Sequence, residues 1–385
     1  MIVFTSVTKS YIPKARVLAH SLKKFHPDWH FALLLSDELP LSFDLESEPF
    51  DEIINIKELD IPNLKSWTFG HSVVELCTAV KGPAAELLAK RPNVDKIMYL
   101  DPDIKVFSSL TFLESLLDVN DILLTPHLLK MENDINAIQD NEISVLKHGI
   151  YNLGFFASKT TGQGLDFIKW WSSRLQSFCR DDIPNGLFTD QRWCDLAPVF
   201  FDKLHIVRDC GTNVASWNIA HRRISKNKEG RYMVGNEPLR FYHFSSFDDG
   251  IGFSVLQKYK DILDDDIVYE VWNDYKDDLN NCGQQDISLK NWELGYYENG
   301  VTIKNQQRSL YRSRIDLQRK FKDPYSLVEP CFLSWWKKDI SIQKNILLRF
   351  LIEVSILFNK CLIKIKQDGL INFVCFVWKK LTNLK

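Results

Sequence analysis

The sequence predicts an α/β protein built in three layers, with helices on both faces of a mostly parallel sheet. Short apolar runs alternate with stretches of helical length over residues 1–250, which is the pattern of repeated strand-helix-strand units. The chain has 385 residues, of which 45% are hydrophobic and 25% charged, so it can bury a full core. Its net charge of −2 gives no general attraction to nucleic acid, and we expect no nucleic-acid partner.

The elements are expected in a regular order from the N-terminus. The strands are residues 2–5, 31–35, a run that ends at Leu100, 122–125, 154–157 and 239–244. The helices are residues 13–24, 73–90 and 165–178. Pro13 suits the first turn of the first helix, because a proline lacks the N–H that this position leaves unbonded. Gly82-Pro83 interrupts the second helix, and the third is amphipathic.

The character of the chain changes after residue 250. An acidic helical stretch with Trp and Tyr covers residues 260–280, and a loop-like segment covers 281–299. We therefore expect a first domain at 1–250, a helical and loop extension packed on it at 251–339, and basic amphipathic helices at 340–385. This last region carries eight Lys or Arg against two acids. It has no apolar run near the ~20 residues of a membrane span, so it either lies on an anionic membrane surface or packs against protein.

The eight cysteines are scattered, without a Cys-x-x-Cys pair or a Cys/His grouping at zinc spacing. Free thiols in a reducing compartment fit this spacing better than a disulfide framework. The N-terminus starts directly with a strand-like Ile-Val-Phe, which is not the pattern of a signal peptide. We expect a cytoplasmic protein, with peripheral contact at the inner membrane through the C-terminus as an option.

Two carboxylates, Asp101 and Asp103, follow the apolar run that ends at Leu100. Open α/β sheets bind ligands at the carboxyl ends of their strands. Carboxylate oxygens suit Mg²⁺ or Mn²⁺, and such an ion usually completes its coordination with substrate phosphates. The motif therefore predicts a nucleoside-diphosphate substrate. Asp-Pro is also ordinary turn chemistry, and phosphatases of the haloacid dehalogenase class use Asp-x-Asp as well, although near the chain start and without a lysine at the position of Lys105.

Other segments supply further polar groups at strand ends. Thr5 and Ser6 end the first strand and Tyr11 follows, which suits a nucleobase that is bonded at its edge and stacked on its face. Asn152 and Gly154 interrupt an apolar strand, where glycine permits close approach and the amide offers a donor and an acceptor. Thr189 is expected to cap a helix that presents its neighbours Asp190 and Gln191. His243 lies near the end of the last strand, where it would be a natural third metal ligand.

The order of these segments resembles the family 8 glycosyltransferases of the GT-A fold, which include glycogenin and bacterial lipopolysaccharide galactosyl- and glucosyltransferases. The resemblance covers about residues 1–250. It is carried by Ile-Val-Phe with Tyr11, Tyr-Leu-Asp-Pro-Asp, Tyr-Asn-Leu-Gly-Phe-Phe, Asp190-Gln191 and Phe-Tyr-His-Phe. It implies a GT-A fold, a UDP-sugar donor, Mn²⁺ (or Mg²⁺), and transfer of a hexose with retention. The change of character after residue 250 adds a helical C-terminal extension to this fold. Our hypothesis for the acceptor is a glycan or lipid-linked glycan in bacterial surface polysaccharide biosynthesis.

The resemblance also implies roles for individual residues. The metal ligands would be Asp101, Asp103 and His243. The donor would be held by Thr5, Ser6, Tyr11, Lys81, Asp101 and Asn152. Asp190 would hold the hydroxyls of the donor sugar, and Gln191 would lie below the anomeric carbon.

Two departures from the family pattern affect the donor site. Val7 and Thr8 stand where the family has acidic residues, and the family's lysine after the metal histidine is missing. Another cation must then contact the diphosphate, and Lys81, Arg222 and Arg223 are candidates. The two arginines end the segment 209–223, which is rich in Asn, Trp, His and Arg. Further sugar or phosphate contacts are expected there from Asn213, Trp217, His221 and Arg222.

Two alternatives remain open at this stage. An inverting enzyme of the same fold would need a carboxylate base, which Asp248 or Asp249 could supply. A chain that has lost turnover could serve as an assembly subunit, although a complete Asp/Asp/His set speaks against this.

Overall fold

The computed structural model describes residues 1–39, 43–259, 267–286 and 291–338. The chain divides into two compact units, the first ending at Arg314 and the second beginning at Ile315. The basic helices expected at 340–385 lie outside the described residues, as do the first residues of the helix expected at 260–280.

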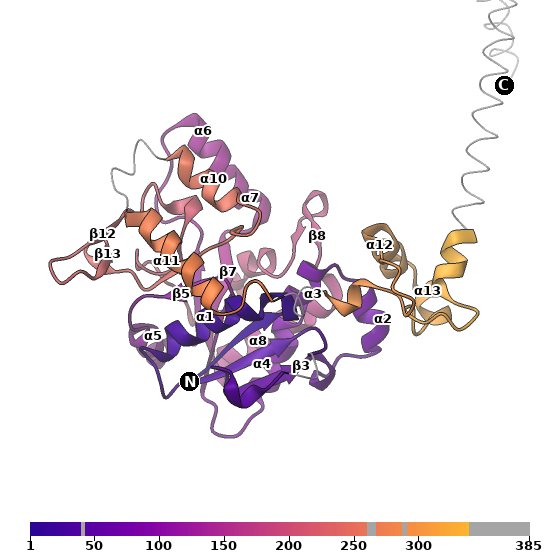
Figure 1. Cartoon of the computed structure of the whole chain (residues 1–385). Helices are drawn as coiled ribbons and strands as arrows, with labels where there is room; N and C mark the ends of the chain where they lie inside the picture. Colours follow the sequence, from indigo (N-terminus) through magenta and orange to yellow (C-terminus); the bar gives the residue numbers. More distant parts are fainter. Residues whose placement is uncertain (40–42, 260–266, 287–290, 339–385) are drawn as a thin grey trace, which may run out of the picture. The chain divides into compact units, whose positions relative to one another are not determined.

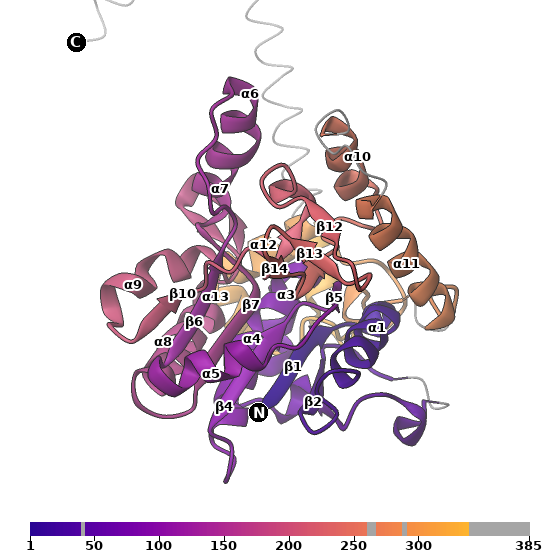
Figure 2. The same ribbon diagram turned by 90° about the vertical axis from the view of Figure 1, so that its left-hand side faces the viewer.

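A seven-stranded sheet forms the centre of the first unit, in the order β10-β6-β7-β4-β1-β2-β3 (Figure 2). Its strands are β1 (Ile2–Val7), β2 (His30–Leu35), β3 (Glu52–Asn55), β4 (Lys96–Leu100), β6 (Ile122–Pro126), β7 (Tyr151–Lys159) and β10 (Leu204–Ile206). β7 runs antiparallel to both of its neighbours, and the other pairs are parallel. The α/β class with a central, mainly parallel sheet is confirmed.

Helices cover both faces of this sheet, which gives the three expected layers. One face packs against α3 (Val73–Ala79), α4 (Lys81–Ala89) and α8 (Gly162–Phe178). The other face packs against α1 (Ile12–Lys23) and α5 (Thr111–Val119). The helical stretch expected at 73–90, with an interruption at Gly82-Pro83, is two helices that meet at Val80. Gly82 packs on α8, where a Cβ would lie 2.5 Å from the Cα of Ser172.

A small second sheet brings distant segments together beside the end of β4. It contains β5 (Ile104–Val106), β11 (Val214–Ala215) and β15 (Phe241–His243), in the order β11-β15-β5. His243 pairs with Ile104 across β15 and β5, and the Phe244 N–H donates to the carbonyl of Asp103 at 2.8 Å. This pairing places the histidine next to the two carboxylates that precede β5.

A third core joins the N-terminal part of the unit to its later helices. Val17 of α1 packs in one apolar cluster with Tyr242 of β15 and Tyr275 of α11 (Ile267–Asn281). Figures 1 and 2 show α11 beside α1. α10 (Ile251–Lys258) contributes Leu256 to the same cluster.

The first unit also contains further elements. They are α2 (Leu64–Phe69), α6 (Ile135–Ala137), α7 (Ile143–His148), α9 (Ala197–Phe200), α12 (Asn305–Ser313), β8 (Asp181–Asp182), β9 (Leu187–Phe188), β12 (Ile224–Lys226), β13 (Tyr232–Val234) and β14 (Glu237–Pro238). In the second unit, α13 (Ile315–Lys320) is followed by an aromatic group in which Phe332 contacts Phe321 and stacks on Trp335. No helix among the described residues is long and apolar enough to cross a membrane.

Candidate active site

Asp101, Asp103 and His243 form a compact cluster of potential metal ligands. Asp101 follows β4, Asp103 precedes β5, and His243 ends β15. One ligand atom from each side chain lies within 4.8 Å of those of the other two. The Nε2 atom of His243 is 3.1 Å from Asp103 Oδ1 and 3.7 Å from Asp101 Oδ2. Two carboxylates and one imidazole nitrogen at this separation suit a divalent cation of the Mg²⁺ or Mn²⁺ class.

The charges in this cluster stabilise one another. Burial by itself would raise the pKa of Asp103, but the nearby His243, together with Lys14, lowers the pKa to about 2. Burial by itself would lower the pKa of His243, but Asp103 and Asp101 outweigh it and raise the pKa. The two carboxylates therefore supply the negative charge that a bound cation would neutralise.

Asn152 fixes the orientation of the histidine. Its Oδ1 atom accepts hydrogen bonds from the Gly154 N–H at 3.2 Å, from Asn213 Nδ2 at 3.1 Å and from His243 Nδ1 at 3.2 Å. Because Nδ1 of His243 is thereby a donor, Nε2 is the nitrogen that faces the carboxylates and can bind a metal. A Cβ on Gly154 would lie 2.5 Å from the Cε1 of His243, so glycine makes room for the imidazole ring.

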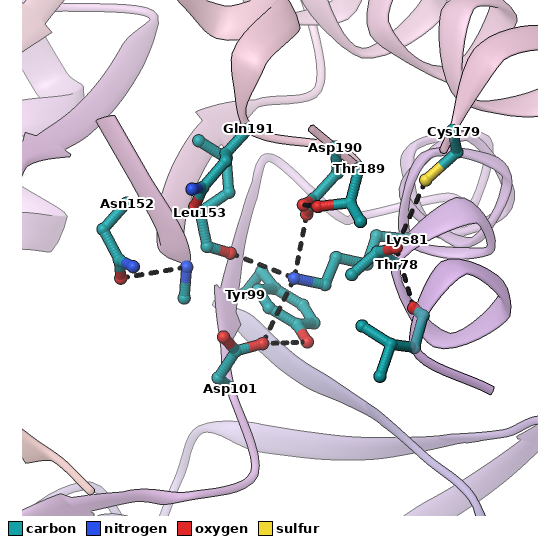
Figure 3. A network of polar contacts seen from close by, with 12 residues as sticks. Thr78, Lys81, Tyr99, Asp101, Asn152, Leu153, Cys179, Thr189, Asp190 and Gln191 are labelled. Atoms are coloured by element: carbon teal, nitrogen blue, oxygen red, sulfur yellow. Dashed lines mark hydrogen bonds and ion pairs between the residues drawn. The ribbon is translucent and has the colours of Figure 1, made fainter. Parts of the chain in front are cut away.

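Lys81 lies at the start of α4 and links the metal cluster to Asp190 (Figure 3). Its Nζ atom is 3.1 Å from Asp101 Oδ1, 2.9 Å from Asp190 Oδ2 and 3.1 Å from the carbonyl of Leu153. It also lies 4.2 Å from the centre of the Tyr99 ring, whose hydroxyl donates to Asp101 at 2.6 Å. Burial would lower the pKa of this lysine, but the two carboxylates raise it, so Lys81 is a permanent cation.

Asp190 and Gln191 lie on an irregular turn instead of the expected helix. Thr189 has a φ of +42° and its hydroxyl donates to Asp190 Oδ1 at 3.1 Å, so it caps no helix, and the next 3-10 helix begins at Arg192. Burial raises the pKa of Asp190 in spite of Lys81. The side-chain amide of Gln191 donates to the carbonyl of His148 at 2.9 Å. Both residues are buried.

A cavity of about 390 Å³ joins these groups. Its lining includes the metal cluster together with Lys81, Asn152, Asp190, Gln191 and Trp217. Residues of α7, among them Ser144 and His148, form another part of the wall. The volume lies within the range of small-molecule sites, about 300–1,000 Å³. The cavity therefore combines a cation site, a carboxylate-lysine pair and an aromatic ring.

The N-terminal corner has unsatisfied polar groups. Thr5 and Ser6 are buried on β1, and their hydroxyls have no hydrogen-bond partner within the described residues. Tyr11 is 39% exposed, and Lys14 Nζ lies 4.2 Å from the centre of its ring. Buried hydroxyls without a partner are costly unless a ligand or water bonds them, so this corner can bind a polar ligand beside an aromatic face.

Three residues expected as sugar or phosphate contacts bond to protein groups. Asn213 donates to Asn152 and Thr125. His221 pairs with Glu132 at 2.8 Å, and Arg222 donates to the carbonyls of Thr212 and Asn213. Among the described residues, none of the three is part of the cavity lining.

Sequence analysis missed several residues of the site. Tyr99 precedes Asp101 by two positions, so the alternation of side chains in a strand would have placed both on one face. His127 lines the cavity, and its burial lowers its pKa to about 4. No periodic pattern in the segment around it pointed to the site. Lys14 lies on the buried face of an ordinary amphipathic helix, and only the structure reveals its neighbours.

No family model matches the chain. It is similar to the uncharacterized protein YfnD of Bacillus subtilis (strain 168), with 25% identity over 249 residues that cover 63% of this chain and 76% of that protein.

Several solved structures are similar to this one. The galactosyltransferase LgtC in complex with donor and acceptor sugar analogs shares 17% identity at a TM-score of 0.43, with 68% of this chain and 95% of that chain covered. The glycosyltransferase GlyE of Streptococcus pneumoniae TIGR4 shares 17% identity at a TM-score of 0.41, with 77% and 66% covered. Mouse xyloside xylosyltransferase 1 shares 14% identity at a TM-score of 0.37, with 64% and 97% covered. At these identities and TM-scores we infer function from the side chains of the site.

Proposed function

We propose that this protein is a metal-dependent glycosyltransferase that moves a hexose from a UDP-sugar to a glycan or lipid-linked glycan. The observation that carries the proposal is the Asp101, Asp103 and His243 cluster, which shares one cavity with Lys81, Asp190 and Gln191. Nucleoside-diphosphate sugars present a phosphate pair to a cation and hydroxyls to carboxylates and amides. The cavity offers both kinds of group.

The nucleoside would occupy the corner formed by Thr5, Ser6 and Tyr11. The two buried hydroxyls lack protein partners, and the tyrosine offers a partly exposed ring. Asp190, which Lys81 holds in place, would accept hydrogen bonds from the donor sugar. Trp217 lines the cavity with a buried Nε1–H that has no partner among the described residues, so it would contribute a ring face and one donor to a sugar.

In the proposed transfer, the bond between the anomeric carbon and the diphosphate oxygen breaks, and its electron pair stays with the UDP oxygen. The acceptor hydroxyl oxygen forms the new bond to the anomeric carbon, and its proton passes to the departing phosphate oxygen. Positive charge that develops on the sugar ring would be stabilised by Asp190 and the Gln191 carbonyl. A bound divalent cation would supply charge neutralisation for the leaving diphosphate.

We propose retention of configuration over inversion. An inverting enzyme needs a carboxylate base near the reacting carbon. Asp248 pairs with Lys14 at 2.7 Å, and Asp249 accepts from the Ile251 N–H at 2.9 Å. Neither carboxylate belongs to the described lining of the cavity. NMR analysis of the anomeric product would decide the question, because a product of opposite configuration contradicts this part of the proposal.

The first experiment measures binding and slow hydrolysis of UDP-glucose, UDP-galactose and their N-acetyl forms, with Mn²⁺ and with EDTA. We expect binding that depends on the metal and is lost in Asp103→Ala. The exposed Asp60 provides a matched control variant, Asp60→Ala, which should behave as the wild type. If the wild type binds no UDP-sugar in the presence of Mn²⁺, the donor assignment is wrong. The better explanation is then that the protein has lost turnover and serves as an assembly subunit.

We further propose a role in bacterial surface polysaccharide (lipopolysaccharide or capsule) biosynthesis, at the cytoplasmic face of the inner membrane. The support is the surplus of basic residues with apolar neighbours at 340–385, a composition that favours binding to anionic lipid surfaces. A variant that ends before Ile340 should lose co-flotation with vesicles that contain anionic lipid. Unchanged flotation of this variant would remove the membrane assignment and leave the enzymatic one intact.

A further inference from the structure

The two carboxylates of Asp101 and Asp103 would balance the charge of a divalent cation between them, so a diphosphate that binds to this cation still needs a cationic side chain. Lys81 already contacts two carboxylates and a carbonyl. Arg222 donates to two backbone carbonyls. Arg223 is exposed. The three cationic side chains that the sequence suggested thus bond to protein groups or face solvent. A different cationic side chain near the metal cluster would have to contact the diphosphate.

Lys14 is a buried cation in the right region of the fold. It lies in the first turns of α1, directly after the corner formed by β1 and Tyr11. Its side chain is 3% exposed, and its Nζ atom is 2.7 Å from Asp248 Oδ2 and 4.2 Å from the centre of the Tyr11 ring. Its neighbours Ile12 and Ala15 on α1 pack in one apolar core with Ile104, the residue that follows Asp103. Lys14 therefore lies next to the nucleoside corner, on a helix that packs against the strand after Asp103.

The partner of Lys14 is suited to be exchanged for a ligand. The side chain of Asp248 is 42% exposed, so water can solvate its carboxylate when the lysine leaves it. The lysine itself is buried, and a cation in that position needs an anionic partner at all times. A carboxylate oxygen and a phosphate oxygen are both acceptors for an ammonium group.

We propose that Lys14 binds the diphosphate of the donor nucleotide, and that in the free protein the carboxylate of Asp248 occupies the place of a phosphate oxygen. This inference rests on the proposed function and extends it, because it assigns a charge contact to a residue that carries no sequence motif. Binding of the diphosphate releases Asp248 to solvent and leaves the ammonium group paired.

The test compares the binding of UDP and uridine by isothermal titration calorimetry in the presence of Mn²⁺, using the full chain. In Lys14→Met we expect the affinity for UDP to fall about 10- to 100-fold, the loss of one charge-assisted hydrogen bond. The affinity for uridine should change less than about twofold, because uridine carries no phosphate. Lys24→Met, at the exposed end of the same helix, is the matched control and should bind UDP as the wild type does.

Asp248→Asn tests the exchange separately. If the carboxylate competes with phosphate, this variant should bind UDP more tightly than the wild type, by about threefold or more. The double variant Lys14→Met/Asp248→Asn carries no unpaired carboxylate, so it checks that weak binding in Lys14→Met does not arise from misfolding. It should bind UDP as weakly as Lys14→Met does.

The outcomes separate this inference from the proposed function. If the wild type binds UDP and Lys14→Met binds it equally well, or loses uridine and UDP to the same extent, Lys14 is no phosphate contact. If Asp248→Asn binds UDP no more tightly than the wild type, the exchange with Asp248 is overturned. If the wild type itself binds no UDP in the presence of Mn²⁺, the proposed function has failed first.

Discussion

The Oδ1 atom of Asn152 accepts a hydrogen bond from Nδ1 of His243 at 3.2 Å. The same oxygen also accepts from the Gly154 N–H and from Asn213, so the amide cannot turn its NH₂ group toward the ring without losing these bonds. The imidazole is therefore held with Nε2 toward Asp101 and Asp103. The strand β7 thus supports the metal cluster without contributing a ligand.

Asn152→Ala should weaken metal binding more than it weakens folding. Loss of a group that orients a metal-binding histidine typically costs about 10- to 100-fold in affinity, and we expect a loss of this size for Mn²⁺. Titration with Mn²⁺ followed by electron paramagnetic resonance would measure it. If the affinity for Mn²⁺ is unchanged, His243 is oriented by its other contacts or is not a ligand.

Gly154→Ala should displace the same histidine by contact. The new methyl group would lie 2.5 Å from Cε1 and 2.8 Å from Nδ1 of His243, which is too close for any real contact. We expect weaker Mn²⁺ binding than in the wild type together with a loss of stability of about 1–3 kcal/mol, the usual range for overpacking. Calorimetric titration and urea unfolding would measure the two effects. A variant that keeps both properties would show that β7 and β15 can move apart freely.

Much of the fold could be predicted from local patterns. The apolar runs at β1, β4, β6 and β7 predict buried strands, and the amphipathic stretches at α1 and α8 predict helices. Short strands such as β5 were missed. β5 has three residues and pairs with the distant strand β15, and so short a segment shows no periodic pattern of apolar residues. An interruption of the helical stretch at 73–90 was expected at Gly82-Pro83, and the two helices meet two residues earlier, at Val80.

The chemistry of the site was predictable only where it lies in a motif. Asp101, Asp103 and His243 were expected together, and the structure places them together. The hydrogen bonds of Asn152 to His243 and of Arg222 to the backbone could not be foreseen, because they depend on the pairing of β15 with β5 and β11. Lys14 and Asp248 are 234 positions apart, and no spacing rule connects such residues.

Lys81→Met should be strongly destabilising, because Asp101 and Asp190 share its charge. Removal of one partner from a buried ion pair typically costs about 3–5 kcal/mol, and Asp190 is almost fully buried. The double variant Lys81→Met/Asp190→Asn should recover part of this loss, since the buried carboxylate is then gone. Urea unfolding of the two variants would measure the recovery. If both are equally unstable, the loss comes from packing of the lysine chain against Tyr99 and not from its charge.

His71 should make the protein sensitive to acid. Burial lowers its pKa from 6.5 to about 4 in the folded protein, and its Nδ1–H donates to the carbonyl of Trp67 at 2.8 Å. Between these pH values the unfolded chain binds a proton that the folded chain does not, so the free energy of unfolding falls as the pH falls, by up to about 1.4 kcal/mol per pH unit. The variant His71→Asn keeps an N–H near the position of Nδ1. Urea unfolding should be measured between pH 7 and pH 4, about the range of one histidine titration. The free energy of unfolding should fall less over this range in His71→Asn than in the wild type. The exposed His20 of α1 provides the control His20→Asn, in which the free energy of unfolding should fall as much as in the wild type. If it falls equally in His71→Asn and in the wild type, the acid sensitivity belongs to other groups.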